Sequence, residues 1–386
     1  MDSSLRERAL LPVGLHDLLP PEAEREAALV ERAMGAFGAH GYERVKPPLI
    51  EFEESLVLGM GQPWARQTFR LLDPESKRMM GVRADMTLQV ARIASSRLAN
   101  APRPLRLCYA GEVLRVGGGK LSSSRQLRQI GCELIGSLDA AADAEIVLLA
   151  SHALDALGVQ GLSIDLNLPT MVPAIFAAHG VSGETETRLA ASLARRDAAA
   201  VATEPGLGKL LASLLEVAGP AARAIEKLST LDLPASAEPD RARLIETVRR
   251  IREAEPALVL TVDPVERQGF EYQTGLSFTI FAKGVRRELG RGGRYRIGAG
   301  DSGPGEPAVG FSLLADSIVA AAPQASPAPR VYIPAGRSVQ DARRLRETGW
   351  VTVVGLVAVA DEAAEARRLG CGYLLRPGPE EPQPLD

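Results

Sequence analysis

Two stretches in the first third of the chain alternate apolar and polar positions and predict a pair of β-strands. Residues 105–114 place Leu107 and Tyr109 on one side, with charged or small residues between them. Residues 125–135 are apolar at their centre and end. The intervening VGGGKLSSS, within residues 116–124, is built of residues that favour a flexible loop. We therefore expect a hairpin with a long polar loop at its tip.

A period near 3.6 predicts helices over residues 22–40 and 142–157, with Gly41 ending the first. Residues 162–168 alternate cleanly, which is typical of a half-buried antiparallel strand. The expected apolar stripes of the two helices are Ala27, Val30, Met34 and Phe37, and Ile146, Leu149, Ala153 and Leu157.

Residues 170–256 are rich in Ala, Leu, Arg and Glu without strand-like alternation, which favours a small helical bundle with breaks near 204–208 and 231–238. Strand patterns then resume. The end of the chain is predicted to form a β-α-β-α-β run, followed by an acidic, proline-rich tail. The expected organisation is an α+β fold with three parts: a core domain over 1–325, a helical insertion at 170–256 within it, and a small α/β domain over 330–386.

Charge and cysteine content narrow the class of protein. The 386 residues carry a net charge of −3, so no global field favours nucleic acid. Cys108, Cys132 and Cys371 have no CxxC spacing, which indicates a reducing compartment without structural disulfides or zinc. No uncharged apolar run approaches the length of a membrane span, and the first residues lack the apolar core of a signal peptide. We expect a cytoplasmic protein with no bound metal.

Polar side chains at the ends of the predicted hairpin are candidates for ligand binding. Arg115 has the geometry to clamp a carboxylate or phosphate, and Gln129 and Glu133 can accept from an ammonium group or an imidazole N–H. The alternative is a solvated sheet face, because polar residues on exposed strands are the norm.

The hairpin resembles motif 2 of class II aminoacyl-tRNA synthetases. Its ending, RQLRQIGCELIG, is similar to the RQFHQIGVEVFG pattern of histidyl-tRNA synthetases. The resemblance implies a class II synthetase-like antiparallel sheet flanked by helices. The phrase VRADMT resembles LRPEGT, which implies that Asp85 and Thr87 hold the amino group of an amino acid. The alternative is that Asp85 lies at the N-terminus of a helix, where the helix dipole stabilises its carboxylate.

Two further stretches extend the resemblance to a histidine pocket. ERQGFEYQTGLSFTIF and GGRY resemble the family's RGLDYYTG and GGRY phrases, which implies pocket roles for Tyr272 and Tyr295. The same comparison adds three less closely matched candidates, Arg267, Gln268 and Gln273. A proline in the place of Pro48 lies at the family's dimer interface, which implies a homodimer core.

The chain departs from a working synthetase where ATP would bind. Ser317, in GFSLLADSI, stands where the family has the motif 3 arginine, and Gln268 stands where the pocket phrase has another. Losing such fixed cations costs roughly 3 kcal/mol of transition-state stabilisation each. With a reduced anticodon-binding-like domain at the end, the chain is expected to have no catalytic residues, no cofactor and no tRNA substrate.

A synthetase core with these losses is similar to one family, the regulatory subunits of ATP phosphoribosyltransferase. That resemblance implies a non-catalytic protein that forms a hetero-oligomer with the short-form catalytic subunit, activates the first step of L-histidine biosynthesis and passes on feedback by L-histidine. Two alternatives stay open at this point: a divergent histidyl-tRNA synthetase, and an amino-acid-binding paralogue that acts on another partner.

Overall fold

The computed structural model describes residues 10–57, 67–117, 124–267, 273–298, 303–324, 327–376 and 381–385. The chain divides into two compact units, Met1–Ala322 and Pro323–Asp386, and each is described by itself. Gln268, Tyr272 and most of the loop at 116–124 lie outside the described residues.

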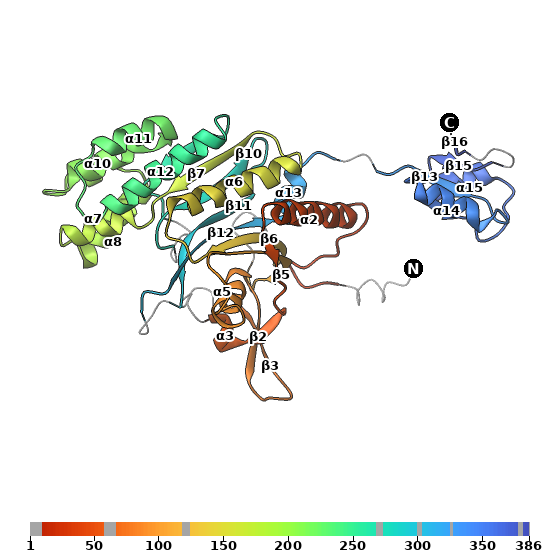
Figure 1. Ribbon diagram of the computed structural model, residues 1–386, viewed down its shortest axis with the longest axis horizontal. Helices are drawn as coiled ribbons and strands as arrows, with labels where there is room; N and C mark the ends of the chain where they lie inside the picture. Colours follow the sequence, from red (N-terminus) through yellow and green to blue (C-terminus); the bar gives the residue numbers. More distant parts are fainter. Residues whose placement is uncertain are drawn as a thin grey trace. The chain divides into compact units, whose positions relative to one another are not determined.

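A nine-stranded sheet forms the centre of the first unit (Figure 1). All neighbouring strands are antiparallel except two pairs, β1–β5 and β7–β9, and the predicted antiparallel sheet is thus confirmed. The strand at 162–168, predicted as antiparallel, is antiparallel to β10 but parallel to β9. The order is β1 (Glu43–Arg44), β5 (Leu105–Leu114), β6 (Gln126–Ile135), β12 (Glu306–Leu314), β11 (Gly290–Ile297), β10 (Ser277–Ala282), β7 (Leu162–Asn167), β9 (Val259–Asp263) and β8 (Gly219–Pro220).

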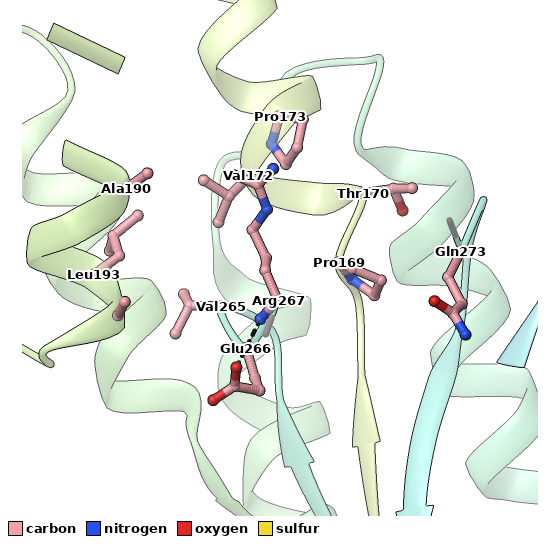
Figure 2. Close-up of a pocket in the computed structure, with 11 residues that line it drawn as sticks. Pro169, Thr170, Val172, Pro173, Ala190, Leu193, Val265, Glu266, Arg267 and Gln273 are labelled. Carbon is pink, nitrogen blue, oxygen red and sulfur yellow. Dashed lines mark hydrogen bonds between the residues drawn. The ribbon is translucent and has the colours of Figure 1, made fainter. Parts of the chain in front are cut away.

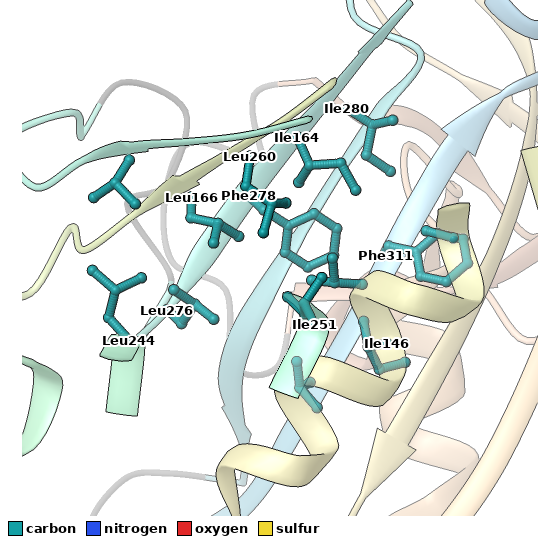
Figure 3. Packing of buried hydrophobic residues seen from close by; sticks show 14 of the residues in the cluster. Ile146, Ile164, Leu166, Leu244, Ile251, Leu260, Leu276, Phe278, Ile280 and Phe311 are labelled. Carbon is teal, nitrogen blue, oxygen red and sulfur yellow. The ribbon is translucent and has the colours of Figure 1, made fainter. Parts of the chain in front are cut away.

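Helices cover one face of this sheet and enclose the main core (Figure 1). They are α2 (Glu22–Ala39), α6 (Ala140–Ala156), α12 (Glu238–Ala254) and α13 (Ala315–Ala321). Figure 3 shows Ile146 of α6 and Ile251 of α12 against Phe278 and Phe311 of the sheet. The prediction for α2 is wrong at Ala27, which is exposed; the buried stripe is instead completed by Leu29 and Ala33.

The opposite face carries α5 (Thr87–Ser96) over a smaller apolar cluster. A separate three-stranded sheet precedes α5 in the chain, and its β3 and β4 pair as an antiparallel hairpin. This sheet consists of β2 (Ile50–Phe52), β4 (Met79–Val82) and β3 (Phe69–Leu72), with α3 (Glu53–Val57) beside it. The polar residues of the candidate site lie on this less covered face.

The insertion is helical, with breaks at 203–207 and 231–237, close to the predicted 204–208 and 231–238. Its two-residue strand β8 pairs with β9 at the edge of the central sheet and was not predicted. Besides α12, its helices are α7 (Met171–Ala178), α8 (Gly183–Ala194), α9 (Ala198–Ala202), α10 (Gly208–Val217) and α11 (Ala221–Thr230).

The second unit is a four-stranded sheet in the order β14-β13-β15-β16. The predicted β-α-β-α-β run is confirmed, but the acidic tail adds the strand β16, which pairs antiparallel with β15. The elements are β13 (Arg330–Ile333), α14 (Val339–Glu347), β14 (Val351–Val354), α15 (Glu362–Arg368), β15 (Tyr373–Leu374) and β16 (Gln383–Pro384). Among the described residues of both units, no helix has the length and apolar character needed to cross a membrane.

Candidate functional site

Glu133 lies at the centre of a polar cluster on the sheet face that carries α5. Its neighbours on β6, Cys132 and Leu134, point into the helix-covered core, so the strand turns Glu133 to the other face. The side chain is only 1% exposed. Across from it on β12 is Gly310, where an added Cβ would overlap the Glu133 carboxylate. The glycine therefore leaves the space that the buried carboxyl occupies.

Two tyrosines, one on β5 and one on β11, hold this carboxyl. The Tyr295 hydroxyl donates to Oε2 of Glu133 at 2.9 Å, and the Tyr109 hydroxyl donates to Oε1 at 3.1 Å. Tyr109 Oη also lies 2.9 Å from Ser312 Oγ and 3.2 Å from Thr87 Oγ1. Side chains of β5, β6, β11, β12 and α5 thus meet at one buried point.

Gln129 extends the cluster to a second carboxylate. Its Nε2 donates to Asp85 Oδ2 at 2.9 Å and to Ser312 Oγ at 2.7 Å, while its Oε1 accepts the Met86 N–H at 2.9 Å. Asp85 Oδ1 accepts the N–H of Thr87, the first residue of α5, at 2.7 Å. Asp85 therefore supports the helix start and contacts the cluster at once. We call the connected residues the Glu133 network: Asp85, Thr87, Tyr109, Gln129, Glu133, Tyr295 and Ser312.

The Glu133 network contains two carboxyl groups, those of Asp85 and Glu133, and no basic side chain. Burial raises the pKa of Glu133 from 4.5 to about 8; the hydroxyl of Tyr295 partly offsets this, and the nearby charge of Asp85 adds to it. A site with these properties favours a ligand that brings hydrogen-bond donors or positive charge, such as an ammonium group or an imidazole N–H.

The structure brings together five of the residues that the sequence singled out, namely Asp85, Thr87, Gln129, Glu133 and Tyr295. Arg115 lies beside them: its Nε donates to the carbonyl of Ala84, the residue before Asp85, at 3.4 Å.

Arg267 and Gln273 lie elsewhere. Both line a cavity beside the helical insertion, which Figure 2 shows, and neither belongs to the Glu133 network. Their assignment to a histidine pocket, which the resemblance implied, stays a prediction. Gln268 and Tyr272 are outside the described residues.

Sequence reasoning missed two members of the network, Tyr109 and Ser312. The alternation of residues 105–114 predicts only that Tyr109 occupies an apolar position of a strand. A usable signal was present in Gly131, its partner on β6, where an added Cβ would overlap the Tyr109 ring end. A glycine inside a strand often marks such a close approach.

The position that corresponds to the motif 3 arginine is buried. Ser317, in the first turn of α13, is 0% exposed and packs in the helix-covered core. Its Oγ has no hydrogen-bond partner in the described part of the chain. A side chain at this position starts in the helix-covered core, on the face of the sheet opposite the Glu133 carboxyl.

Pro48, the expected dimer-interface residue, is exposed. Its carbonyl accepts from Gln89 Nε2 at 2.7 Å and from Arg83 Nη1 at 3.4 Å, and the next two side chains, Leu49 and Ile50, are 46% and 37% exposed. No cluster of three or more potential metal ligands occurs among the described residues.

Comparison with known proteins places this arrangement in a family. The model of the Histidyl-tRNA synthetase family matches residues 14–318. The chain is 57% identical to an ATP phosphoribosyltransferase regulatory subunit of Rhodospirillum centenum, over 95% of this chain and 94% of that one. It is 55% identical to the regulatory subunit of Paramagnetospirillum magneticum, over 96% and 97%.

Among solved structures, the fold is similar to an ATP phosphoribosyltransferase regulatory subunit/histidyl-tRNA synthetase from Bacillus halodurans C. The TM-score is 0.80 at 23% identity, over 93% of this chain and 96% of that one. That structure is described both as a regulatory subunit and as a histidyl-tRNA synthetase. The sequence matches favour the first, since the relatives that match along nearly the whole chain are regulatory subunits. The chain belongs to the family of ATP phosphoribosyltransferase regulatory subunits, non-catalytic proteins with a histidyl-tRNA synthetase-like fold.

Proposed function

We propose that this regulatory subunit binds L-histidine at the Glu133 network and transmits the bound state to a short-form ATP phosphoribosyltransferase catalytic subunit. The observation that carries the proposal is the network itself, in which two carboxylates, an amide and two tyrosine hydroxyls converge between β5, β6, β11, β12 and α5. Glu133 would accept from the imidazole, and Asp85 and Thr87 would hold the ammonium group.

Arg115 is the cation proposed for the ligand's carboxylate, because it lies beside Ala84 at the edge of the network. The buried Ser317 disfavours the synthetase alternative, since no motif 3 cation is available for ATP. An allosteric effect further requires that histidine bind two conformations of the complex with different affinity. The network joins four strands and a helix start, so a ligand there contacts several elements at once.

We also propose that the first unit forms a homodimer through the segment that contains Pro48. The exposed Leu49 and Ile50 support this, because adjacent exposed apolar side chains are typical of interfaces. Light scattering of the purified chain tests it. A monomer at micromolar concentration would contradict the dimer, although it would leave the ligand site untouched.

The main experiment mixes the purified chain with the short-form catalytic subunit of the same organism. Condensation of ATP with phosphoribosyl pyrophosphate is followed with and without L-histidine. We expect activation on mixing and inhibition by L-histidine. No complex and no change in rate would overturn the regulatory assignment for this pair.

The Tyr295→Phe variant tests the ligand site. It removes one hydroxyl donor from the Glu133 network, and a hydrogen bond of this kind contributes about 1.5 kcal/mol or more. We expect the L-histidine concentration for half-inhibition to rise roughly tenfold, with activation on mixing unchanged. Tyr373→Phe, in the second unit, is the matched control. Equal inhibition of both variants would place the histidine site elsewhere in the complex.

A further inference from the structure

A cavity of about 450 Å³ lies in the first unit beside the helical insertion (Figure 2). Its walls come from α7, α8, the residues that follow β7 and β9, and Gln273, four positions before β10. No member of the Glu133 network lines it. The lining residues are Pro169, Thr170, Val172, Pro173, Ala190, Leu193, Ala194, Val265, Glu266, Arg267 and Gln273.

The topology places this cavity where a ligand is commonly bound. β7 and β9 are parallel neighbours, so their carboxyl ends meet at the same edge of the sheet. Crevices outside the carboxyl ends of parallel strands are common ligand sites. An ion pair fixes the wall: Arg196, which follows α8, donates through Nη1 to Asp263 at the end of β9 at 3.0 Å. The pair therefore ties the segment after α8 to the end of β9, next to residues that line the cavity.

One buried polar group in the cavity wall has no partner. Gln273 is 7% exposed, and its Oε1 has no hydrogen-bond donor among the described residues. A buried acceptor without a donor costs about 1–3 kcal/mol. Figure 2 shows this amide oxygen turned toward the side of the cavity where Pro169 lies. A ligand that donates a hydrogen bond at this point would remove the cost.

Two charged side chains stand at the mouth. Arg267 is exposed, and Figure 2 shows its side chain running past Val172 toward Pro173. No hydrogen bond or ion pair joins its guanidinium to another residue of the described chain. The Glu266 carboxylate accepts the Arg267 N–H at 2.9 Å. The mouth therefore offers a cation for an acidic group, with a carboxylate close to it.

Apart from Thr170, whose hydroxyl donates to Asp240 Oδ2, the remaining described wall is apolar. Val172, Leu193 and Val265 supply branched side chains, and prolines and alanines fill the spaces between them. A volume of this size is within the roughly 300–1,000 Å³ of small-molecule sites, which are mostly apolar with a few placed polar groups. The ligand that matches carries a carboxylate, a hydrogen-bond donor and an apolar side chain.

We propose that this cavity is a second ligand site, separate from the Glu133 network, and that it binds an α-amino acid with an apolar side chain. The carboxylate pairs with Arg267, the ammonium group donates to Gln273 Oε1 and lies near Glu266, and the side chain packs against Val172 and Leu193.

The test measures L-leucine binding to the purified full chain by isothermal titration calorimetry and ligand-observed NMR. We expect saturable binding, at least tenfold weaker for 4-methylpentanoate, which lacks the ammonium group, and for 3-methylbutylamine, which lacks the carboxylate. Arg267→Gln and Gln273→Leu should each weaken L-leucine at least tenfold. Arg343→Gln, an exposed arginine of α14, is the matched control and should leave the affinity unchanged.

Two measurements distinguish binding at this cavity from binding at the proposed histidine site, and weakened binding from loss of folding. Glu133→Gln should leave L-leucine binding unchanged while it weakens L-histidine binding. Gln273→Leu should unfold at the same temperature as the parent or higher, because it removes an unpaired buried acceptor. The proposal is overturned if neither L-leucine nor L-phenylalanine binds saturably at millimolar concentration. It is equally overturned if both cavity variants keep the parent affinity.

Discussion

At the scale of single residues, Glu133 shows how one buried carboxyl combines a cost to the fold with a use in binding. Tyr109 and Tyr295 donate to both of its oxygens, yet burial still raises its pKa to about 8. Glu133 therefore holds a proton near neutral pH. It can release that proton when a ligand supplies hydrogen-bond donors in its place. Binding of a cationic ligand should therefore be linked to pH in this range.

The Glu133→Gln variant tests this electrostatic account. The folded chain keeps the Glu133 proton between pH 4.5 and about 8, whereas the unfolded chain releases it. The resulting stabilisation is complete below pH 4.5 and is lost as the pH rises to about 8. Glutamine cannot ionise, so the variant should lose this slope and be more stable at pH 8, by an amount on the order of a few kcal/mol. Urea unfolding across this range measures it, and an unchanged slope would assign the pH dependence to other groups.

Gly310 tests the close packing around the carboxyl. A methyl group at this position would overlap Glu133, and both lie in central strands with little freedom to move. Gly310→Ala should lower the unfolding free energy by roughly 1–3 kcal/mol and abolish L-histidine binding. Gly35→Ala, in α2, has open space around it and should stabilise the helix by roughly 0.5–1 kcal/mol. Equal stability of the two variants would show that the site is more plastic than the structure indicates.

Residue-level prediction from the sequence worked where an ordered motif fixed several positions together. Asp85, Gln129 and Glu133 come together as that resemblance implied. Ser312 was missed because a small polar residue in a buried strand carries no signal until its cross-strand neighbours are known. Gln273 lines a separate cavity that the sequence did not indicate, because local spacing does not show which distant elements a residue will face.

At the scale of elements, Arg83 ties the candidate site to the rest of the first unit. Its Nε donates to the Glu112 carbonyl of β5 at 2.6 Å, and its Nη1 donates to the Pro47 carbonyl at 3.1 Å. Its backbone N–H also bonds the Leu49 carbonyl at 3.1 Å. The side chain is 6% exposed. This single residue therefore connects the β4 end, the segment before β2 and the hairpin that carries Gln129.

Arg83→Lys tests that connection. The lysine ammonium carries all its N–H donors on one nitrogen. It cannot reach the separate carbonyls that the nitrogens of the planar guanidinium bond in different directions. Leaving buried carbonyls unpaired should lower the unfolding free energy by about 1–3 kcal/mol, measured by urea denaturation. Arg249→Lys, on the exposed face of α12, should keep the parent midpoint. If the two variants unfold alike, the buried bonds of Arg83 do not hold these elements together.

Element boundaries followed from periodicity where one face of an element is buried. The strand β5 and the helix α2 agree closely with their patterns because burial imposes a period of 2 or 3.6. The parallel pairing of β7 with β9 and the strand β16 were not predictable in this way. Both depend on which distant segment supplies the hydrogen bonds, and no local alternation records that.

At the scale of the whole molecule, the chain keeps a histidyl-tRNA synthetase-like fold, with a buried serine in the place of the motif 3 arginine. Ser317 is fully buried between the sheet and its helices, and α13 packs against α2. The conversion from enzyme to regulator is then a property of packing as well as of lost arginines. Restoring one cation should be insufficient to restore catalysis.

Ser317→Arg tests this statement directly. An arginine at a fully buried position introduces an unpaired charge, which should lower the unfolding free energy by roughly 3–5 kcal/mol. Because position 317 is buried in the helix-covered core, the new guanidinium would not be presented on the face that carries the Glu133 network. We therefore expect no histidine-dependent ATP–pyrophosphate exchange at temperatures where the variant remains folded. Ser229→Arg, at an exposed position of α11, is the matched control and should keep the parent stability. A stable Ser317→Arg variant with measurable exchange would show instead that the nucleotide site survives and that the missing cation alone separates this chain from a synthetase.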